Sequence, residues 1–304
     1  MTSILLLGKD GQVGWQLQRS LAPLGTVTAV GRAECDLADT ARLRQVIREV
    51  SPRIIVNAAA YTAVDKAEAE ADLANLINAE APAVIAEEAK SLDALLVHYS
   101  TDYVFDGCKS APYVETDAPN PQSVYGRSKL AGEQAIMAAG CRALIFRTSW
   151  VFGARGNNFV KTILRLTAEG RALRIVDDQI GSPTPAAMIS DVTGLVLAAL
   201  RHGGKLPETV TLYHLAAANP VSWCVFARAI VACAANTPGF SGLPAPEAIT
   251  AINTADYPLP AVRPINSRLD CSRLEADFGL ELPDWQPYLS RMLQLLALKK
   301  ANGY

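Results

Sequence analysis

The 304-residue sequence has little charge, few histidines and no long apolar run, and each shortage excludes a class of protein. Only 19% of the residues are charged, the formal net charge is −2, and no block of basic residues is present. Nucleic-acid-binding proteins usually carry a basic stripe, so binding to DNA or RNA is not expected. No apolar run approaches the roughly 18 residues that cross a bilayer, and the apolar segment 4–7 runs directly into glycine. We therefore expect neither a membrane span nor a signal peptide.

The spacing that is typical of metal sites is also missing. The six cysteines form no Cys-x-x-Cys pair, and the three histidines are dispersed, so a zinc site is not expected. An acid-rich run over residues 65–70 reads as the solvated face of a helix rather than a metal site. Free thiols are typical of a reducing compartment, which predicts a cytoplasmic protein.

A glycine-rich loop lies between an expected strand over residues 2–7 and an expected helix that ends at Leu24. The loop places Gly8, Gly11 and Gly14 in the spacing Gly-x-x-Gly-x-x-Gly. Glycines at such a joint let backbone N–H groups approach a pyrophosphate, and the N-terminus of the helix favours its negative charge. The loop therefore predicts dinucleotide binding, although glycines also form plain turns.

The end of the second expected strand, over residues 26–30, bears on the choice between NAD and NADP. Proteins that prefer NAD often carry an acid here, which binds the ribose hydroxyls. This sequence has Gly31-Arg32 instead, and an arginine can pair with the 2′-phosphate of NADP. We expect NADPH, with NADH possible; a solvated surface arginine is the alternative. Asp36 and Leu37 follow, and we expect them at the adenine end of the cofactor.

Strands and helices alternate along the first half of the chain. Further strands are expected over 53–57, 95–99 and 142–148, with helices over 40–50 and 75–91 and another that carries Tyr125. This alternation predicts a Rossmann-type α/β fold, a doubly wound parallel sheet with helices on both faces. Ligands in such folds bind beyond the carboxyl ends of the strands, where the small residues Ala58, Ala59 and Ala60 leave room.

The second half predicts a smaller, loop-rich α/β region. We expect helices from Asn158 to Gly170 and over 188–201, 222–235 and 287–300, a strand over 211–216, and proline-rich loops over 237–264. We assign residues 1–150, with segments near 175–200, to an NAD(P)-binding domain. Residues 151–304 belong mostly to the second region, which we expect to bind substrate.

Tyr125 and Lys129 form the candidate catalytic pair. They lie four residues apart, and therefore on the same side of a helix about one turn apart. A neighbouring ammonium lowers the pKa of a phenol, which makes it a better acid at neutral pH. Thr101, at the end of another strand, is placed to hold a substrate oxygen against the phenol. The pair alone occurs by chance on many helix surfaces. The catalytic interpretation is supported by the glycine loop, which is expected at the same edge of the sheet.

These motifs together resemble the dTDP-4-dehydrorhamnose reductases, which belong to the extended short-chain dehydrogenases/reductases. The resemblance covers essentially the whole chain and rests on GKDGQVGW (8–15), VNAAAYTAVDKAE (56–68), HYSTDYVF (98–105), YGRSKLAGE (125–133), FRTSW (146–150), GNNF (156–159), DQIGSPT (178–184) and RPINS (263–267).

The resemblance implies that dTDP-4-dehydro-β-L-rhamnose is reduced to dTDP-β-L-rhamnose, with Tyr125 as proton donor. Lys129 would hold the nicotinamide ribose and lower the pKa of the phenol. The cofactor would contact further residues around the loops, namely Gln12, Val13, Ala59, Ala60, Tyr61, Thr62 and Tyr99. The sugar would contact Thr101, Asp102, Tyr125, Trp150 and Asn158. Arg263 and Asn266 are candidate anchors for the rest of the nucleotide sugar, although a structural ion pair explains Arg263 almost as well.

One departure from the family concerns metal and assembly. Some members place an acidic residue just after the loop tryptophan and bind Mg²⁺ there between two subunits. This chain has Gln16, a weaker ligand for a hard cation. We therefore expect no metal requirement, and a monomer or a homodimer that does not depend on metal.

Two alternatives remain open. The chain could act on another nucleotide-linked deoxysugar, as a 4-ketoreductase or an epimerase. It could also be a non-catalytic regulatory subunit on the same fold, but such proteins usually lose part of the Thr/Tyr/Lys set, which this sequence keeps.

Overall fold

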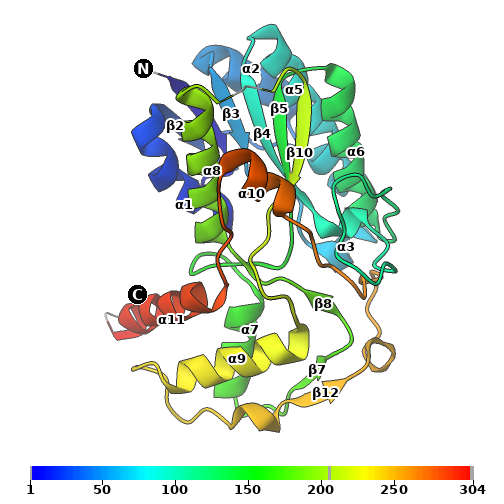
Figure 1. Cartoon of the computed structure of the whole chain (residues 1–304), viewed down its shortest axis with the longest axis vertical. Coiled ribbons are helices and arrows are strands. Elements are labelled where there is room, and N and C mark those ends of the chain that lie inside the picture. The colour runs from blue at the N-terminus through cyan, green and yellow to red at the C-terminus, as the bar shows by residue number, and fades with distance from the viewer. Residues whose placement is uncertain (1, 205–206, 302–304) are drawn as a thin grey trace.

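The computed structural model describes residues 2–204 and 207–301, and its centre is a six-stranded parallel sheet (Figure 1). The strands follow the order β10-β5-β4-β3-β1-β2 across the sheet. Their bounds are β1 (Ser3–Leu7), β2 (Thr26–Val30), β3 (Ile54–Asn57), β4 (Leu95–Thr101), β5 (Ala143–Thr148) and β10 (Val210–His214). The chain leaves β1 for the edge strand β2 and then returns to the other side of β1 as β3. This reversal marks the point where such sheets bind ligands.

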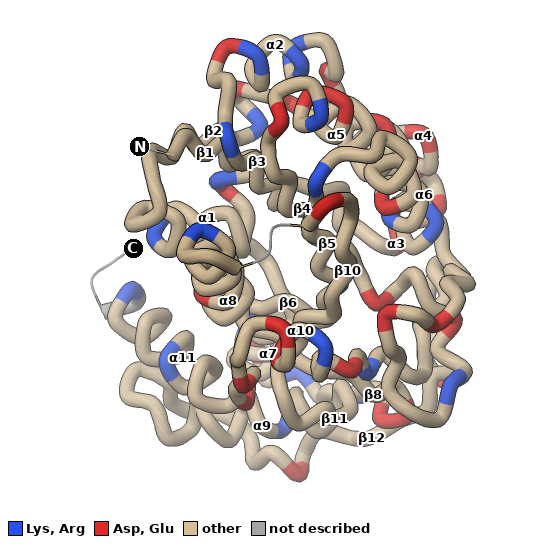
Figure 2. Tube along the Cα trace, turned by 45° about the horizontal axis from the view of Figure 1, so that its top comes forward, with Lys and Arg blue, Asp and Glu red and all other residues tan. Residues whose placement is uncertain are grey.

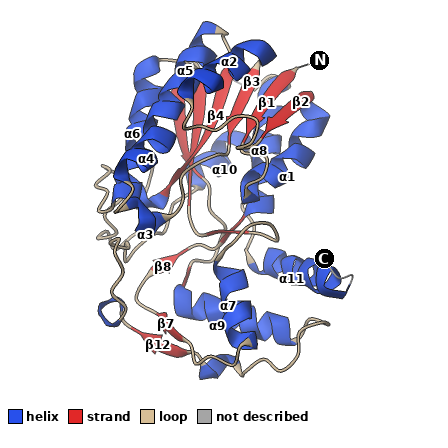
Figure 3. Cartoon of the chain, turned by 180° about the vertical axis from the view of Figure 1, so that it is seen from behind, coloured by secondary structure: helices blue, strands red, loops and turns tan. Residues whose placement is uncertain are grey.

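Helices cover both faces of the sheet, which confirms the predicted Rossmann-type fold (Figure 3). On one face α1 (Gln12–Leu21) packs against α8 (Ala186–Arg201). On the other face α5 (Ala81–Ser91) packs between α2 (Thr40–Val50) and α6 (Val124–Ala139).

The apolar run at the start of the chain exists because β1 is buried on both faces. Ile4 and Leu6 belong to the core beneath α1 and α8, whereas Leu5 and Leu7 belong to the core beneath α2 and α5. Successive side chains of a strand point to opposite faces, so a fully covered strand is apolar throughout.

A second, smaller lobe lies beyond the carboxyl ends of the strands (Figure 1). It contains α7 (Phe159–Ala168), α9 (Trp223–Ala235) and α11 (Gln286–Ala301). Short strands pair around these helices: β7 (Arg174–Val176) with β12 (Thr250–Ile252), β8 (Ile180–Gly181) with β11 (Val221–Ser222), and β6 (Val151–Phe152) with β9 (Thr184–Pro185). Phe152, Phe226 and Trp285 join the same apolar core as the sheet residues Ile4 and Leu6, so the two lobes share one core.

Several elements differ from the sequence expectations. The helix expected over 75–91 is divided into α4 (Ala71–Asn75), a π-helical turn (Leu76–Glu80) and α5. The strand expected in the second region, β10, joins the large sheet beside β5. Helix α10 (Ser272–Phe278) was not expected, and β12 lies in a stretch that was expected to be loop. The remaining elements are single turns: Ala22–Leu24, α3 (Val64–Ala67), Asp102–Val104, Pro246–Ala248 and Thr254–Asp256.

Charged residues of both signs are interspersed over the chain, as the nearly neutral composition requires (Figure 2). Within the described residues, no helix is both long and apolar enough to cross a membrane.

Candidate active site

The glycine loop packs tightly against the chain that follows β3. Gly8 has a φ of +86°, and a Cβ at this position would lie 2.8 Å from the backbone nitrogen of Ala59. A Cβ at Gly14 would lie 2.0 Å from the carbonyl oxygen of Gly8. At Gly11, by contrast, an added Cβ would meet only the Gly8 carbonyl oxygen, at 3.4 Å. Gly8 and Gly14 are therefore required for the close packing of the loop, whereas Gly11 has room for a side chain.

Helix α1 begins at this open position. Gly11 is its N-cap, Gln12 and Val13 form its first turn, and none of the described side chains caps it. Its first N–H groups can therefore bind an anionic group, to which the helix N-terminus adds a favourable dipole. Binding of a dinucleotide pyrophosphate by these residues stays a prediction, with which this geometry is compatible.

The end of β2 carries two ion pairs. Arg32 is largely exposed and pairs with Asp36 at 2.9 Å, while the neighbouring Leu37 is buried. Lys9 pairs with Glu34, whose second carboxylate oxygen accepts a hydrogen bond from the backbone of Gly31. These contacts hold the pKa of Glu34 below its ordinary value. Lys9 and Glu34 were not among the predicted site residues, because their ion pair depends on the fold.

Asn78 fixes the loop that follows β3, which was also missed. Its side-chain oxygen accepts a hydrogen bond from the Tyr61 backbone at 2.9 Å, and its side-chain nitrogen donates to the Tyr61 carbonyl at 3.0 Å. The same nitrogen donates to the Ser128 hydroxyl of α6 at 3.0 Å. Asn78 therefore joins the Ala60–Tyr61–Thr62 segment to the helix of Tyr125. It lies in the π-helical turn, and such turns are frequent at functional sites.

The end of β4 carries Thr101 and Asp102, both of them buried. The Thr101 hydroxyl donates to Asp102 Oδ1 at 3.0 Å and accepts from the Tyr103 backbone at 3.1 Å. Thr101 also lies within hydrogen-bonding reach of Tyr125, so the structure brings together these two predicted residues. Burial raises the pKa of Asp102 to about 6, and hydrogen bonds from Ser267 and Thr101 oppose this shift.

Lys129 is fully buried and reaches the same strand. Its Nζ donates to the Tyr99 carbonyl oxygen at 2.7 Å and lies 3.2 Å from His98 Nε2. His98 Nδ1 in turn lies 3.2 Å from the Asn57 side-chain nitrogen. Burial lowers the pKa of Lys129 to about 8 and holds that of His98 well below its usual value. His98 and Asn57 were not among the predicted site residues.

The pKa of Tyr125 differs from the expectation. The sequence analysis expected Lys129 to lower it, but in the structure it lies above its ordinary value. Burial of the hydroxyl is the largest cause, and it outweighs the hydrogen bond with Thr101; the charge of Asp102 raises the pKa further. The Lys129 ammonium is meanwhile engaged by Tyr99 and His98. The phenol therefore stays protonated in this state, as a proton donor must.

Trp150, which follows β5, packs against another aromatic ring, whereas Asn158 is held by hydrogen bonds. Trp150 is partly exposed and stacks on Trp223, with ring centroids 3.5 Å apart. Asn158 caps α7 through a hydrogen bond from Lys161, and its side-chain nitrogen donates to Gln12 and to the Gly153 carbonyl. Asn158 thus joins the glycine loop to the second lobe.

Arg263 and Asn266 are held by protein groups. Arg263 donates to Asp65 at 2.6 Å and to the Tyr103 hydroxyl at 3.1 Å, which is the structural ion pair considered as the alternative. The Asn266 side chain donates to the carbonyls of Lys109 and Ala111. Both residues bind the second lobe to loops of the first.

The comparisons with known proteins extend over nearly the whole chain. The family profile described as RmlD substrate binding domain matches residues 1–298. The chain belongs to this family. A dTDP-4-dehydrorhamnose reductase of Burkholderia thailandensis is 49% identical over 284 residues, or 93% of this chain and 95% of the relative. The corresponding reductase of Escherichia coli K12 is 45% identical over 299 residues, or 97% and 98% of the two chains.

A solved structure of a reductase has the same fold as this chain. The Bacillus anthracis dTDP-4-dehydrorhamnose reductase, crystallised in complex with NADP, has a TM-score of 0.86 and 34% identity to this RmlD family member. The match covers 96% of this chain and 99% of the other.

Three acidic residues outside the glycine loop of this RmlD family member are engaged by protein groups. Glu133 forms a buried pair with Arg147, Asp191 pairs with Arg19 at 2.6 Å, and Glu275 accepts from the Leu282 backbone. Across residues 2–204 and 207–301, no three His, Cys, Asp or Glu side chains gather as a metal site would require.

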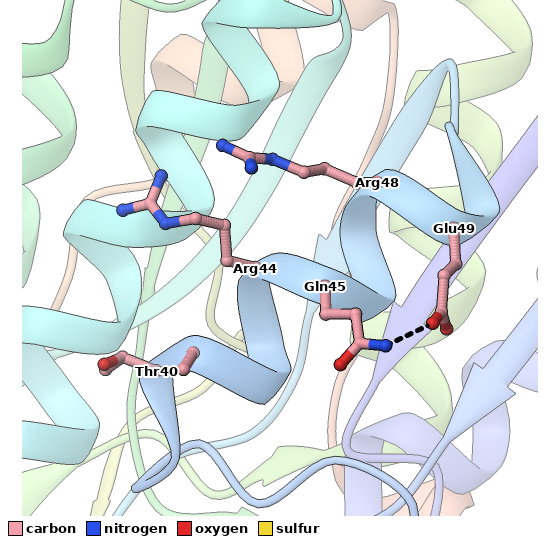
Figure 4. Close-up of a pocket in the computed structure, with 6 residues that line it drawn as sticks. Thr40, Arg44, Gln45, Arg48 and Glu49 are labelled. Carbon is pink, nitrogen blue, oxygen red and sulfur yellow. Dashed lines mark hydrogen bonds between the residues drawn. The ribbon is translucent and has the colours of Figure 1, made fainter.

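Two hollows elsewhere on the surface lie apart from the candidate active site. One lies over α2, where Arg44 and Arg48 point away from Gln45 and Glu49 (Figure 4). The two arginines are held by Glu88 of α5 at 2.6 and 2.8 Å. The other hollow is lined by residues at the amino ends of the strands, including Thr2, Ile54 and Leu95. Both therefore lie away from the edge where Rossmann-type sheets bind ligands.

Proposed function

We propose that this RmlD family member reduces the C4 ketone of dTDP-4-dehydro-β-L-rhamnose to dTDP-β-L-rhamnose, with NADPH as reductant. The proposal rests on the position of Thr101, within hydrogen-bonding reach of Tyr125 and beside the buried Lys129, at the carboxyl edge of the sheet. A reductase needs a proton donor and a hydrogen-bond donor at one point, and these residues supply both.

The chemistry follows from the side chains. NADPH supplies the hydride when it is bound. Tyr125 gives its proton to the oxygen on which negative charge develops. The Thr101 hydroxyl, which donates to Asp102 in the free chain, turns to donate its hydrogen bond to the same oxygen. Electrostatic stabilisation of this kind is strong in a buried site, because water is excluded from it.

Lys129 has a second role in the proposal. Its ammonium holds ribose hydroxyls of the cofactor and favours the phenolate that remains when Tyr125 has given up its proton. Because its pKa is about 8, the ammonium is the main form at neutral pH. The lowering of the phenol pKa would then belong to the complex with cofactor rather than to the free chain.

The preference for NADPH rests on Arg32. Its side chain is largely exposed, and among the described residues it pairs with Asp36, in an ion pair that solvent weakens. It is therefore free to turn towards a 2′-phosphate. We further propose that Trp150 contacts the sugar, and that Arg263 and Asn266 shape the anchor for the nucleotide by holding the two lobes together.

Metal and assembly complete the proposal. The ion pairs of Glu133 and Asp191 leave these carboxylates poorly suited to bind Mg²⁺. We propose catalysis without a divalent ion, by a cytoplasmic monomer or a homodimer that is independent of metal.

The proposal is tested by mixing the purified protein with NADPH and the dTDP-linked 4-keto sugar and following absorbance of the reduced cofactor. We expect one NADPH to be consumed for each sugar reduced, and the isolated protein to carry no tightly held NAD. An epimerase would instead keep its cofactor through a complete cycle. Turnover of the sugar without net loss of NADPH would overturn the proposal.

A further inference from the structure

Trp150 has an unusual backbone conformation for a large residue. Its φ is +47°, a value that only three other non-glycine residues adopt in the described chain, Ser51, Asp93 and Asn219. For a bulky side chain this conformation is unfavourable, and it persists only where the surroundings hold it. Strain of this kind concentrates at sites of function.

The strained Trp150 lies close to the proposed catalytic residues in the sheet. Thr148, two residues earlier, pairs with Thr101 across β4 and β5. Trp150 therefore follows β5 at the sheet edge that carries Thr101, and the residue remains partly exposed.

Trp223 supports one side of the indole. The two rings are nearly parallel, at 12°, with centroids 3.5 Å apart. Trp223 is itself backed by Phe159, at 4.5 Å. It begins α9, which is capped by the Ser222 hydroxyl, and Ser222 also hydrogen-bonds Asp177. Trp223 is thus a fixed support.

Gly181 leaves the space that the indole occupies. A Cβ at this position would lie 2.6 to 2.9 Å from three atoms of the ring, Cε2, Cζ2 and Nε1. Real Cβ atoms do not approach so closely, so any larger residue would displace the indole. The neighbouring backbone is fixed as well, because Ser149 donates to the Ser182 carbonyl and the Thr184 backbone donates to the Trp150 carbonyl.

We propose that Gly181 and Trp223 are positioning residues that fix the Trp150 indole as a platform for the sugar of the nucleotide-sugar substrate. The flat face of an indole suits the apolar C–H face of a deoxysugar. The inference rests on the proposed function, in which Trp150 contacts the sugar. It adds that the contact depends on two residues that need not touch the substrate themselves.

The first test is structural and needs no substrate. Two stacked indoles couple electronically and give a pair of circular dichroism bands of opposite sign. We expect this pair in the native chain and its loss in Trp150→Ala, Trp223→Ala and Gly181→Ala. Val225→Ala is the control, because Val225 lies on the same helix and is 44% exposed. It should keep the bands.

The second test is kinetic. Gly181→Ala and Trp223→Ala should raise KM for the nucleotide sugar by about 10- to 100-fold, the range for loss of one well-packed aromatic contact. The dissociation constant for NADPH should stay within about twofold, since the glycine loop is untouched. Trp223→Phe keeps an aromatic support and should recover most of the affinity.

A double-mutant comparison separates positioning from general damage. In a Trp150→Ala background, Gly181→Ala and Trp223→Ala should cause no further rise in KM, because the indole they position is already absent. Additive losses, or a native KM in Gly181→Ala, would overturn the inference. If Trp150→Ala itself leaves KM unchanged, the sugar contact in the proposed function fails instead.

Discussion

Replacing Tyr125 by phenylalanine removes the proposed proton donor and keeps the ring. The ring of Tyr125 packs edge-on against Tyr103, with centroids 5.5 Å apart, and phenylalanine retains this contact. Thr101 loses one partner but keeps its hydrogen bonds with Asp102 and the Tyr103 backbone. The variant should therefore fold normally.

The expected loss is in the chemical step. Removing a general acid lowers kcat by about 10²–10⁴, which corresponds to about 2.7–5.5 kcal/mol of transition-state stabilisation. The loss of one neutral hydrogen bond changes the free energy of unfolding by only about 0.5–1.5 kcal/mol. Activity and stability should therefore separate clearly.

The assay is single-turnover oxidation of NADPH by the keto sugar, together with chemical denaturation. Tyr213→Phe is the matched control, because it also removes a hydroxyl from a buried tyrosine. Tyr213 lies on β10, and its hydroxyl donates to Asp277 of α10 at 2.7 Å. The control should lose stability but keep its rate. If Tyr125→Phe turned over at a near-native rate, another group would have to be the acid.

Three further outcomes follow from the same site. Lys129→Met should weaken NADPH binding and move the pH–rate profile to higher pH. In the native protein, NADPH binding should weaken as the pH rises through about 8, because the buried ammonium then loses its proton. A dissociation constant for NADPH that does not change with pH would count against this role of Lys129. Arg32→Ala should reduce kcat/KM for NADPH by about 10- to 100-fold and leave NADH nearly unaffected, measured against the conservative Arg32→Lys; equal losses with both cofactors would show that Arg32 reads another group. Treatment with EDTA should change neither the sedimentation coefficient nor the turnover, whereas loss of both, restored by Mg²⁺, would mean that Gln16 has not abolished a metal bridge.

The sequence predicted those features that depend on local patterns. The apolar run at 4–7 and the glycines after it define a strand, a loop and a helix within a short stretch, and the structure forms all three. Tyr125 and Lys129 share a helix, so their spacing alone places them on one side of it. Thr101 was expected beside the phenol from its place at the end of a strand, and the structure brings it within reach of Tyr125.

Features that depend on distant segments were not predictable in this way. Asn78 hydrogen-bonds the backbone of Tyr61 from within a π-helical turn, and no composition signal marks that turn. The strand β10 joins β5 after the long crossover through α8, and its short apolar pattern does not reveal which sheet it enters. The pairing of Lys9 with Glu34 likewise requires the end of β2 to lie beside the glycine loop.

The pKa of Tyr125 was likewise not predictable from residue spacing. Spacing predicts that an ammonium is near the phenol, but it does not predict how deeply the hydroxyl is buried. In the free chain burial has the larger effect and raises the pKa. The balance between the two effects is a property of the three-dimensional site.

The most direct test of the account is to reduce the dTDP-linked 4-keto sugar with NADPH that carries deuterium at the transferable position. The account predicts that the native protein forms dTDP-β-L-rhamnose with one deuterium at C4 of the sugar, and that Tyr125→Phe forms the same product far more slowly. A product without deuterium at C4, or one with the opposite configuration at that carbon, would contradict it.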